Sequence, residues 1–111
     1  MKYGNIANEC RQLALVKNQE LSDAYRTDAR KLLPEIIRNA KLYAKEGYRY
    51  FNAYTIPTND LVKYNTNMKN LGYKDLKGVS QALYDILRTE TNFQVELVQH
   101  TWMSFVIQLS W

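Results

Sequence analysis

Apolar residues recur at helical intervals through the first half of the chain. They do so over residues 5–17, from Ile6 through Cys10, Leu13 and Ala14 to Val16, which predicts a helix there. A second run predicts the longest helix, over residues 20–46. Its apolar positions are Leu21, Tyr25, Ala29, Leu32, Leu33, Ile36, Ala40 and Tyr43.

Three residues mark breaks in these helical patterns. Asn18 separates the two runs, and Pro34 lies inside the longer one. Because proline lacks an amide hydrogen and clashes with the preceding turn, we expect a break or kink near Leu33. Gly47 follows Lys45 and stands where a helix C-terminal glycine is expected.

The aromatic-rich segment 48–56 predicts a strand that ends at Pro57. Strand alternation places one set of residues on a common face, namely Tyr48, Tyr50, Asn52, Tyr54 and Ile56. Two shorter helices are expected next, over residues 59–70 and 75–89. The first has Thr58 or Asn59 as its cap, and Asp75 opens the second.

Residues 93–111 predict a β-hairpin with its turn near Gln99–Trp102. Residues 97–111 contain no Asp, Glu, Lys or Arg, unlike the rest of the chain. Two explanations fit this lack of charge. A central strand buried on both faces needs no charged residues. An edge strand of this composition requires a covering helix, a second subunit or a partner protein.

These elements predict one α+β domain over residues 1–111, with helices packed on one face of a three-stranded antiparallel sheet. From residue 34 onward, the order helix, strand, helix, helix, strand, strand resembles that of a winged-helix domain, with an extra helix at the N-terminus. The resemblance lies in element order alone and implies that helix 75–89 reads nucleic acid. Its outward positions would be Lys74, Lys77, Ser80, Gln81 and Tyr84.

Composition limits the chemistry that the chain can perform. The 111 residues include one cysteine, Cys10, and one histidine, His100, and no apolar run is long enough to span a membrane. No phosphate-binding glycine motif, metal-ligand cluster or catalytic pair stands out, so we expect a non-enzymatic protein without cofactor or metal. The lack of a disulfide predicts a cytoplasmic protein. Residue types with AT-rich codons outnumber those with GC-rich codons, which is typical of phages and low-GC bacteria.

The net charge of +4 lies in the N-terminal half of the chain. On a helix, Arg30, Lys31, Arg38, Lys41 and Lys45 share one face, opposite most of the apolar stripe. Such a face can follow a phosphate backbone, or it can simply be solvated. The leading prediction is therefore a DNA- or RNA-binding regulator. Its candidate contact residues are Lys63, Lys74, Lys77, Gln81, Arg30, Arg38 and Lys41.

Aromatic residues support a second hypothesis, a phage-type accessory or inhibitor that binds a protein. Tyrosine and tryptophan dominate protein interfaces, although in a small domain they also fill the core. The candidate contact residues are Tyr50, Tyr54, His100, Trp102 and Trp111. The uncharged C-terminal strand also predicts a possible homodimer through its edge.

Overall fold

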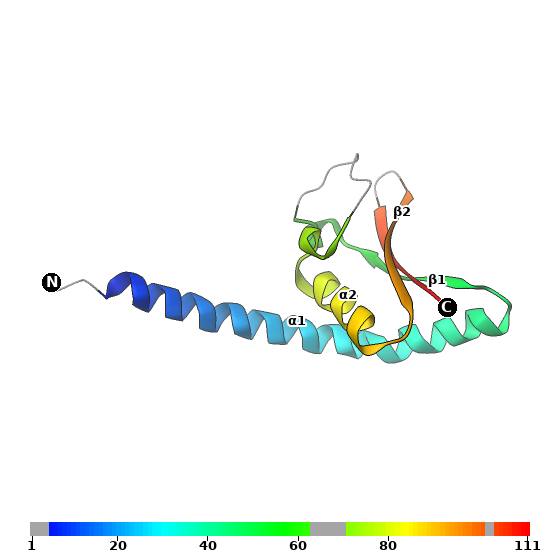
Figure 1. Cartoon of the computed structure of the whole chain (residues 1–111), viewed down its shortest axis with the longest axis horizontal. Coiled ribbons are helices and arrows are strands. Elements are labelled where there is room, and N and C mark those ends of the chain that lie inside the picture. Colours follow the sequence, from blue (N-terminus) through cyan, green and yellow to red (C-terminus); the bar gives the residue numbers. More distant parts are fainter. Residues whose placement is uncertain (1–4, 63–70, 102–103) are drawn as a thin grey trace.

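A computed structural model describes residues 5–62, 71–101 and 104–111, with residue 18 described by its backbone only. These residues form two α-helices and three strands, which confirms the α+β class (Figure 1). They are α1 (Ile6–Lys45), β1 (Tyr50–Ile56), α2 (Gly78–Glu90), β2 (Gln94–Thr101) and β3 (Ser104–Ser110). The helices pack against a sheet of order β1-β3-β2, in which both neighbouring pairs are antiparallel.

Helix α1 is continuous for 40 residues. The predicted separation at Asn18 is therefore wrong, and of the break or kink predicted near Leu33 the break is wrong. Pro34 costs the helix one hydrogen bond, but Ile36 and Ala40 beyond it are buried, as is Ala29 before it. Packing on both sides of Pro34 keeps the helix intact, and its axis bends in the cyan region that contains this proline (Figure 1).

The end of α1 was predicted correctly. The helix stops at Lys45, and Gly47 adopts the left-handed conformation with φ of 93°. Its amide donates to the carbonyl of Ala44 at 3.0 Å, and the amide of Tyr48 donates to the carbonyl of Tyr43 at 3.0 Å. Gly47 thereby reverses the chain into β1.

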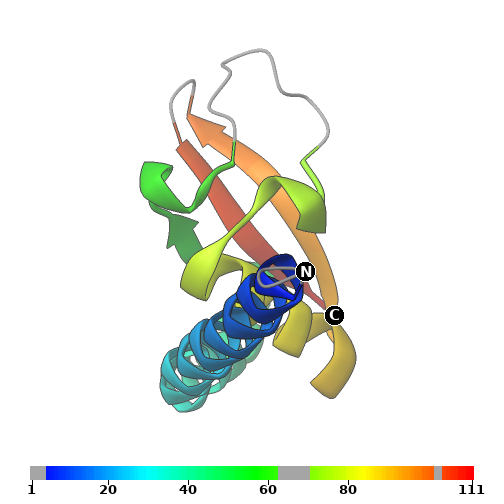
Figure 2. The ribbon, with the colours of Figure 1, turned by 90° about the vertical axis from the view of Figure 1, so that its left-hand side faces the viewer.

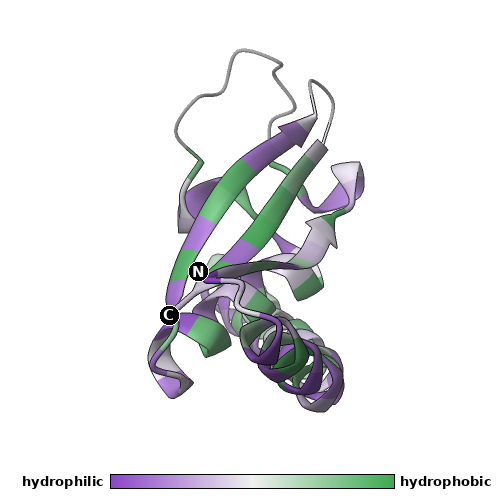
Figure 3. Cartoon of the chain, turned by 90° about the vertical axis from the view of Figure 1, so that its right-hand side faces the viewer, coloured by the Kyte–Doolittle hydropathy of each residue, from purple (hydrophilic) through white to green (hydrophobic). Residues whose placement is uncertain are grey.

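One face of the sheet carries the core. Along β3, Phe105, Ile107 and Leu109 point toward the helices and are buried. Leu83, Ile86 and Leu87 of α2 are fully buried in the same cluster. Helices α1 and α2 lie side by side beneath the strands (Figure 2). Hydrophobic and hydrophilic residues alternate along β2, as expected for a strand with one face on the core (Figure 3).

The predicted C-terminal hairpin is confirmed, since β2 and β3 are antiparallel and pair from Gln94↔Ser110 to Thr101↔Ser104. Its turn falls at residues 102–103, outside the described part of the chain. Strand β3 lies between β1 and β2, so the first of the two explanations for the uncharged tail, a central strand, holds for β3. The lack of charge in this segment is explained in part by the central position of β3, whose residues Phe105, Val106 and Ile107 are all buried.

A β-bulge changes which residues of β1 share a face. The register with β3 shifts between Asn52 and Tyr54. Beyond the bulge, Tyr54 packs partly buried against the core, whereas Tyr50 is 52% exposed. The prediction that these two tyrosines form one aromatic face is therefore wrong, because an inserted residue reverses the alternation.

The segment between β1 and α2 departs from the predicted helices. Residues Thr58–Asp60 and Tyr73–Asp75 form short 3-10 turns, and residues 63–70 lie outside the described structure. Helix α2 begins only at Gly78, so its predicted start at Asp75 is wrong. The winged-helix order is not confirmed, since the described part of 59–70 contains no α-helix.

Candidate binding surfaces

The N-terminal half of α1 projects away from the rest of the molecule. Every described side chain of residues 6–24, here named the helical arm, is exposed. The arm extends beyond both α2 and the sheet (Figure 1) and is roughly 28 Å long. The radius of gyration is 17.7 Å, whereas a compact chain of this length would have about 13 Å. The arm accounts for this elongated shape.

One side of the arm carries an apolar stripe. At about 100° per residue, seven positions fall within a sector of roughly 120°, and six of them are apolar. They are Ile6, Cys10, Leu13, Ala14, Lys17, Leu21 and Ala24. Ile6 is 50% exposed, Leu13 72% and Leu21 40%. An isolated helix of this length is marginal in water, so a partner on this stripe would stabilise the arm.

A groove of about 280 Å³ lies where the arm meets the body of the molecule. Its lining comes from the base of the arm, from the start of α2 and from the turn before it. The lining residues are Leu21, Ser22, Tyr25, Arg26, Tyr73, Lys77, Gly78, Gln81, Ala82 and Asp85. The partly exposed rings of Tyr25 and Tyr73 contribute apolar surface. Nε2 of Gln81 donates to the carbonyl of Tyr73 at 3.1 Å.

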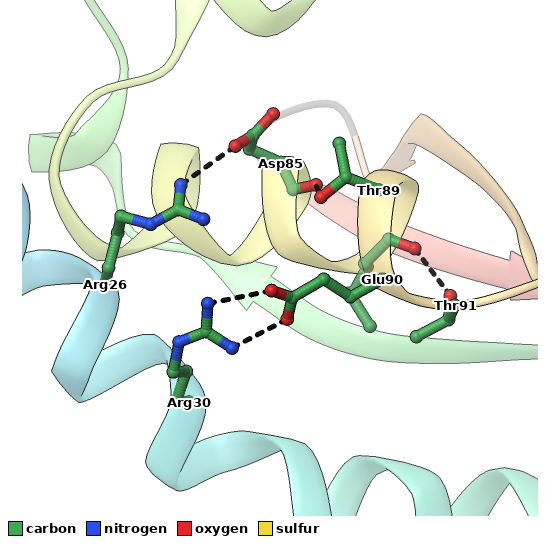
Figure 4. A network of polar contacts seen from close by, with 7 residues as sticks. Arg26, Arg30, Asp85, Thr89, Glu90 and Thr91 are labelled. Carbon is green, nitrogen blue, oxygen red and sulfur yellow. Dashed lines mark hydrogen bonds and ion pairs between the residues drawn. The ribbon is translucent and has the colours of Figure 1, made fainter.

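Two ion pairs fix α1 against α2 (Figure 4). Arg26 contacts the carboxylate of Asp85 at 2.9 Å, beside the groove. One turn further along, Arg30 donates two hydrogen bonds to Glu90, at 2.7 and 2.8 Å. These hydrogen bonds, together with the opposite charge, lower the pKa of Glu90 and raise that of Arg30. The direction in which the arm leaves the body is thus set by paired charges as well as by apolar packing.

The structure separates the residues that were predicted to contact nucleic acid. Lys77 and Gln81 come together in the groove, and Lys74 is exposed nearby on the turn before α2. Arg38 and Lys41 are exposed on the outer side of α1, whereas Arg30 is engaged by Glu90. Lys63 lies outside the described residues.

Helix α2 offers little of the surface that a recognition helix needs. Ser80 is fully buried and donates its hydroxyl to Asp60 at 2.6 Å. Tyr84, the other outward position expected on this helix, is 8% exposed. The base of α1 lies beside the remaining exposed side, across the groove. A duplex groove accepts a helix that stands free on one side, and α2 does not meet this condition.

The residues predicted to contact a protein are also dispersed. Tyr50 is exposed, and Tyr54 is partly buried against the core. His100 is exposed near the end of β2, and Trp102 lies outside the described residues. Trp111 packs edge-on against Phe93, and its indole nitrogen donates to the carbonyl of Tyr48 at 3.1 Å. Trp111 therefore has a structural role in holding the end of the chain against the turn before β1.

Sequence reasoning found part of the apolar stripe of the arm, from Ile6 to Ala14, and did not recognise that it is exposed. The sequence did contain a sign of this exposure, because the apolar positions lie on different sides of α1 in its first and second halves. On a helical wheel, the mean direction of the arm residues Ile6 and Leu21 lies roughly 110° from that of the core residues Ile36 and Ala40. A single continuous helix with two differently oriented apolar sectors cannot bury both against one body. The groove residues Tyr25, Arg26 and Tyr73 were missed as a set because they come from distant segments.

Neither a metal centre nor a membrane span is found in the part of the chain that the structure describes. Within it, no three His, Cys, Asp or Glu side chains gather as potential metal ligands. None of its helices combines the length and apolar character needed to cross a bilayer. Comparison of the chain with protein-family models, curated proteins and solved structures found no match.

Proposed function

We propose that this chain is a non-enzymatic binding protein that docks a protein partner along its helical arm and in the groove at the base of that arm. The observation that carries the proposal is the apolar stripe, on which Ile6, Leu13 and Leu21 are each 40–72% exposed. Contiguous exposed apolar surface on a soluble protein marks an interaction site. An amphipathic helix that meets another helix is a common form of such recognition.

The strength of the interaction follows from the exposed area. Full burial of a leucine or isoleucine contributes about 2 kcal/mol, so covering the exposed fractions of these three side chains contributes roughly 3 kcal/mol per arm. Association costs about 4 kcal/mol or more in lost freedom of motion. A partner must therefore supply its own apolar surface and fill the groove, and we expect micromolar or weaker affinity.

A matched pair of variants tests this proposal. Leu13 lies within the stripe, whereas Leu15 is 60% exposed on the other side of the same helix. Leu13→Ser should abolish stoichiometric binding of a protein partner that survives nuclease treatment and high salt, and Leu15→Ser should retain it. Equal binding by the two variants, or no protein partner at all, would reject the arm as the contact surface.

A second candidate function is nucleic-acid binding through the outer face of α1. It is favoured by Arg38 and Lys41, which are exposed and form no ion pair with the described residues. Binding to a labelled duplex should weaken as salt rises, and Arg38→Gln should reduce the slope of log affinity against log salt by about 1. Arg11→Gln, which removes the same charge from the arm, is the control. Equal slopes for the two variants would exclude this face. Cytoplasmic location and a phage or bacterial source remain predictions from composition.

A further inference from the structure

The end of α1 opposite the arm carries a second exposed surface, of different composition. Residues 41–50, here named the aromatic turn, run from the end of α1 through the turn at Gly47 to the start of β1, and all of them are exposed. They lie at the far end of the molecule from the arm (Figure 1). The large apolar side chains exposed on the arm are aliphatic. Those of the aromatic turn are Leu42, at 50% exposure, and three tyrosines at 41–52%, namely Tyr43, Tyr48 and Tyr50.

The rings of the aromatic turn are held by contacts on both sides. Tyr43 packs against the rings of Tyr48 and Phe51, with centroids 5.4 and 4.7 Å away. The amide of Trp111 donates to the carbonyl of Arg49 at 3.3 Å, and its indole nitrogen donates to the carbonyl of Tyr48 at 3.1 Å. Because the backbone is anchored in this way, the exposed rings need little ordering before they receive a ligand.

Cations alternate with tyrosines along the aromatic turn. Lys41 and Lys45 flank Tyr43, and Arg49 stands between the other two tyrosines. These three cations form no ion pair with the described residues, and Glu46 is the one carboxylate of the segment. A single strand of nucleic acid requires cations for its phosphates and aromatic faces for its bases. The aromatic turn presents both kinds of group within ten residues.

The sheet face that points away from the helices continues this surface with groups that suit base edges. Leu109 belongs to the core, so its neighbour Gln108 and the paired Asn52 lie on the opposite face, which Tyr50 shares. Nε2 of Gln108 donates to Oδ1 of Asn52 at 3.1 Å, which leaves Nδ2 of Asn52 and Oε1 of Gln108 available. Such amides donate and accept hydrogen bonds, as base edges do. Glu96 pairs with Gln108 from β2 and keeps phosphates on the α1 side of this face.

We propose that the aromatic turn binds single-stranded nucleic acid, with bases stacked on Tyr48 and Tyr50 and phosphates held by Arg49, Lys45 and the outer face of α1. This inference rests on the second candidate function, nucleic-acid binding, and names its ligand as a single strand. Unpaired bases can stack on protein rings, whereas a duplex keeps its base faces inside the helix. A preference for the single strand that depends on the rings is therefore the property to measure.

Fluorescence anisotropy with a labelled oligothymidine of about fifteen nucleotides, and with a duplex of the same length, measures this preference. Tyr50→Leu keeps apolar surface but removes the ring, so it should weaken oligothymidine binding about fivefold or more. Tyr50→Phe keeps the ring and should bind as the unaltered chain does, and duplex binding should be equal in the two variants. Arg49→Gln should reduce the slope of log affinity against log salt by about 0.7. Arg11→Gln on the arm is its control. Circular dichroism checks that each variant retains its fold.

Tryptophan fluorescence gives a second readout. The chain has two tryptophans, so Trp102→Phe leaves Trp111, beside the rings, as the only one. Its emission should be quenched when oligothymidine is added. Equal oligothymidine affinity of Tyr50→Leu and Tyr50→Phe would overturn stacking; if duplex binding still depends on Arg38, the second candidate function stands. No binding of either nucleic acid would overturn both. A protein captured by Tyr50→Phe but not by Tyr50→Leu, without binding of oligothymidine, would overturn the proposal and assign the aromatic turn to a protein partner.

Discussion

Asp60 connects the segment after β1 to the start of α2, and its loss should destabilise the fold strongly. Its carboxylate accepts a hydrogen bond from the Ser80 hydroxyl at 2.6 Å and a longer one from the Ser80 amide at 3.3 Å. The carbonyl of Asp60 also accepts the amide of Lys77 at 2.7 Å. Asp60 thus serves as the N-terminal cap of a helix from which it is distant in sequence.

The size of the effect follows from these contacts. Asp60→Ala removes a helix cap, which is worth about 1 kcal/mol. It also leaves the hydroxyl of Ser80, which is fully buried, without its acceptor, at a cost of about 1–3 kcal/mol. We expect a loss of roughly 2–3 kcal/mol in the free energy of unfolding. For 111 residues this corresponds to a fall in Tm of about 10 °C.

Urea unfolding at one fixed protein concentration measures this loss. Ser80→Ala in combination with Asp60→Ala should cost less than the sum of the single changes, because the two groups act together. Asp28→Ala is the control, since Asp28 meets Lys31 only at 3.8 Å on the surface, and its loss should be within about 0.5 kcal/mol. A loss below about 0.5 kcal/mol for Asp60→Ala, or strict additivity with Ser80→Ala, would refute this role.

Two further predictions concern the start and the end of α2. Gly78 has φ of 65°, and an added Cβ would lie 3.1 Å from Oδ1 of Asp60, so Gly78→Ala should lower the free energy of unfolding by about 1–2 kcal/mol. Gly72→Ala, where φ is negative and the nearest atom is 4.0 Å away, should be nearly neutral by the same urea assay. Hydrogen bonds from Arg30 lower the pKa of Glu90 in the folded protein. The ion pair therefore stabilises the fold above the pKa of Glu90 in the unfolded chain, about 4.3. This stabilisation is lost as the pH falls through the lower pKa of Glu90 in the folded protein. The stability difference between the unaltered chain and Glu90→Gln should therefore be present at neutral pH and vanish in acid; a difference that persists in acid would contradict the assignment.

The fold was predictable where local pattern and tertiary packing agree. Gly47 ended a helix as expected, because only its own backbone conformation is involved. The C-terminal hairpin followed from strand alternation and is confirmed. Which strand lies at the centre was not predictable, since the uncharged tail suited a central position and a covered edge equally. Strand order depends on contacts between β1 and β3 that are far apart in sequence.

Errors occurred where packing overrode a local rule. Pro34 is a helix breaker by its covalent structure, but buried residues on both sides keep α1 continuous. The bulge between Asn52 and Tyr54 has no clear sequence signal, and it places Tyr54 against the core while Tyr50 stays exposed. Burial of Ser80 depends on Asp60, which belongs to a different turn. Each error reflects a contact between segments that periodicity alone cannot place together.

The candidate site was predictable in part for the same reason. The arm's apolar stripe is a local property and was found in part, whereas its exposure depends on where the body ends. Arg38 and Lys41 were correctly placed on the outer face of α1, which a helical wheel is enough to show. The groove required the positions of both helices and of the turn at Tyr73, and these come only from the tertiary structure.

Amide hydrogen exchange in residues 6–24 tests the central claim most directly, because it reports whether a partner covers the arm. An uncovered helix of this length frays in water, whereas a paired helix is protected. Protection of the arm should rise when the captured partner protein is added to the unaltered chain or to Leu15→Ser, and remain low for Leu13→Ser. Protection that does not change on addition of the partner, or that is equal in the two variants, would contradict docking along the apolar stripe.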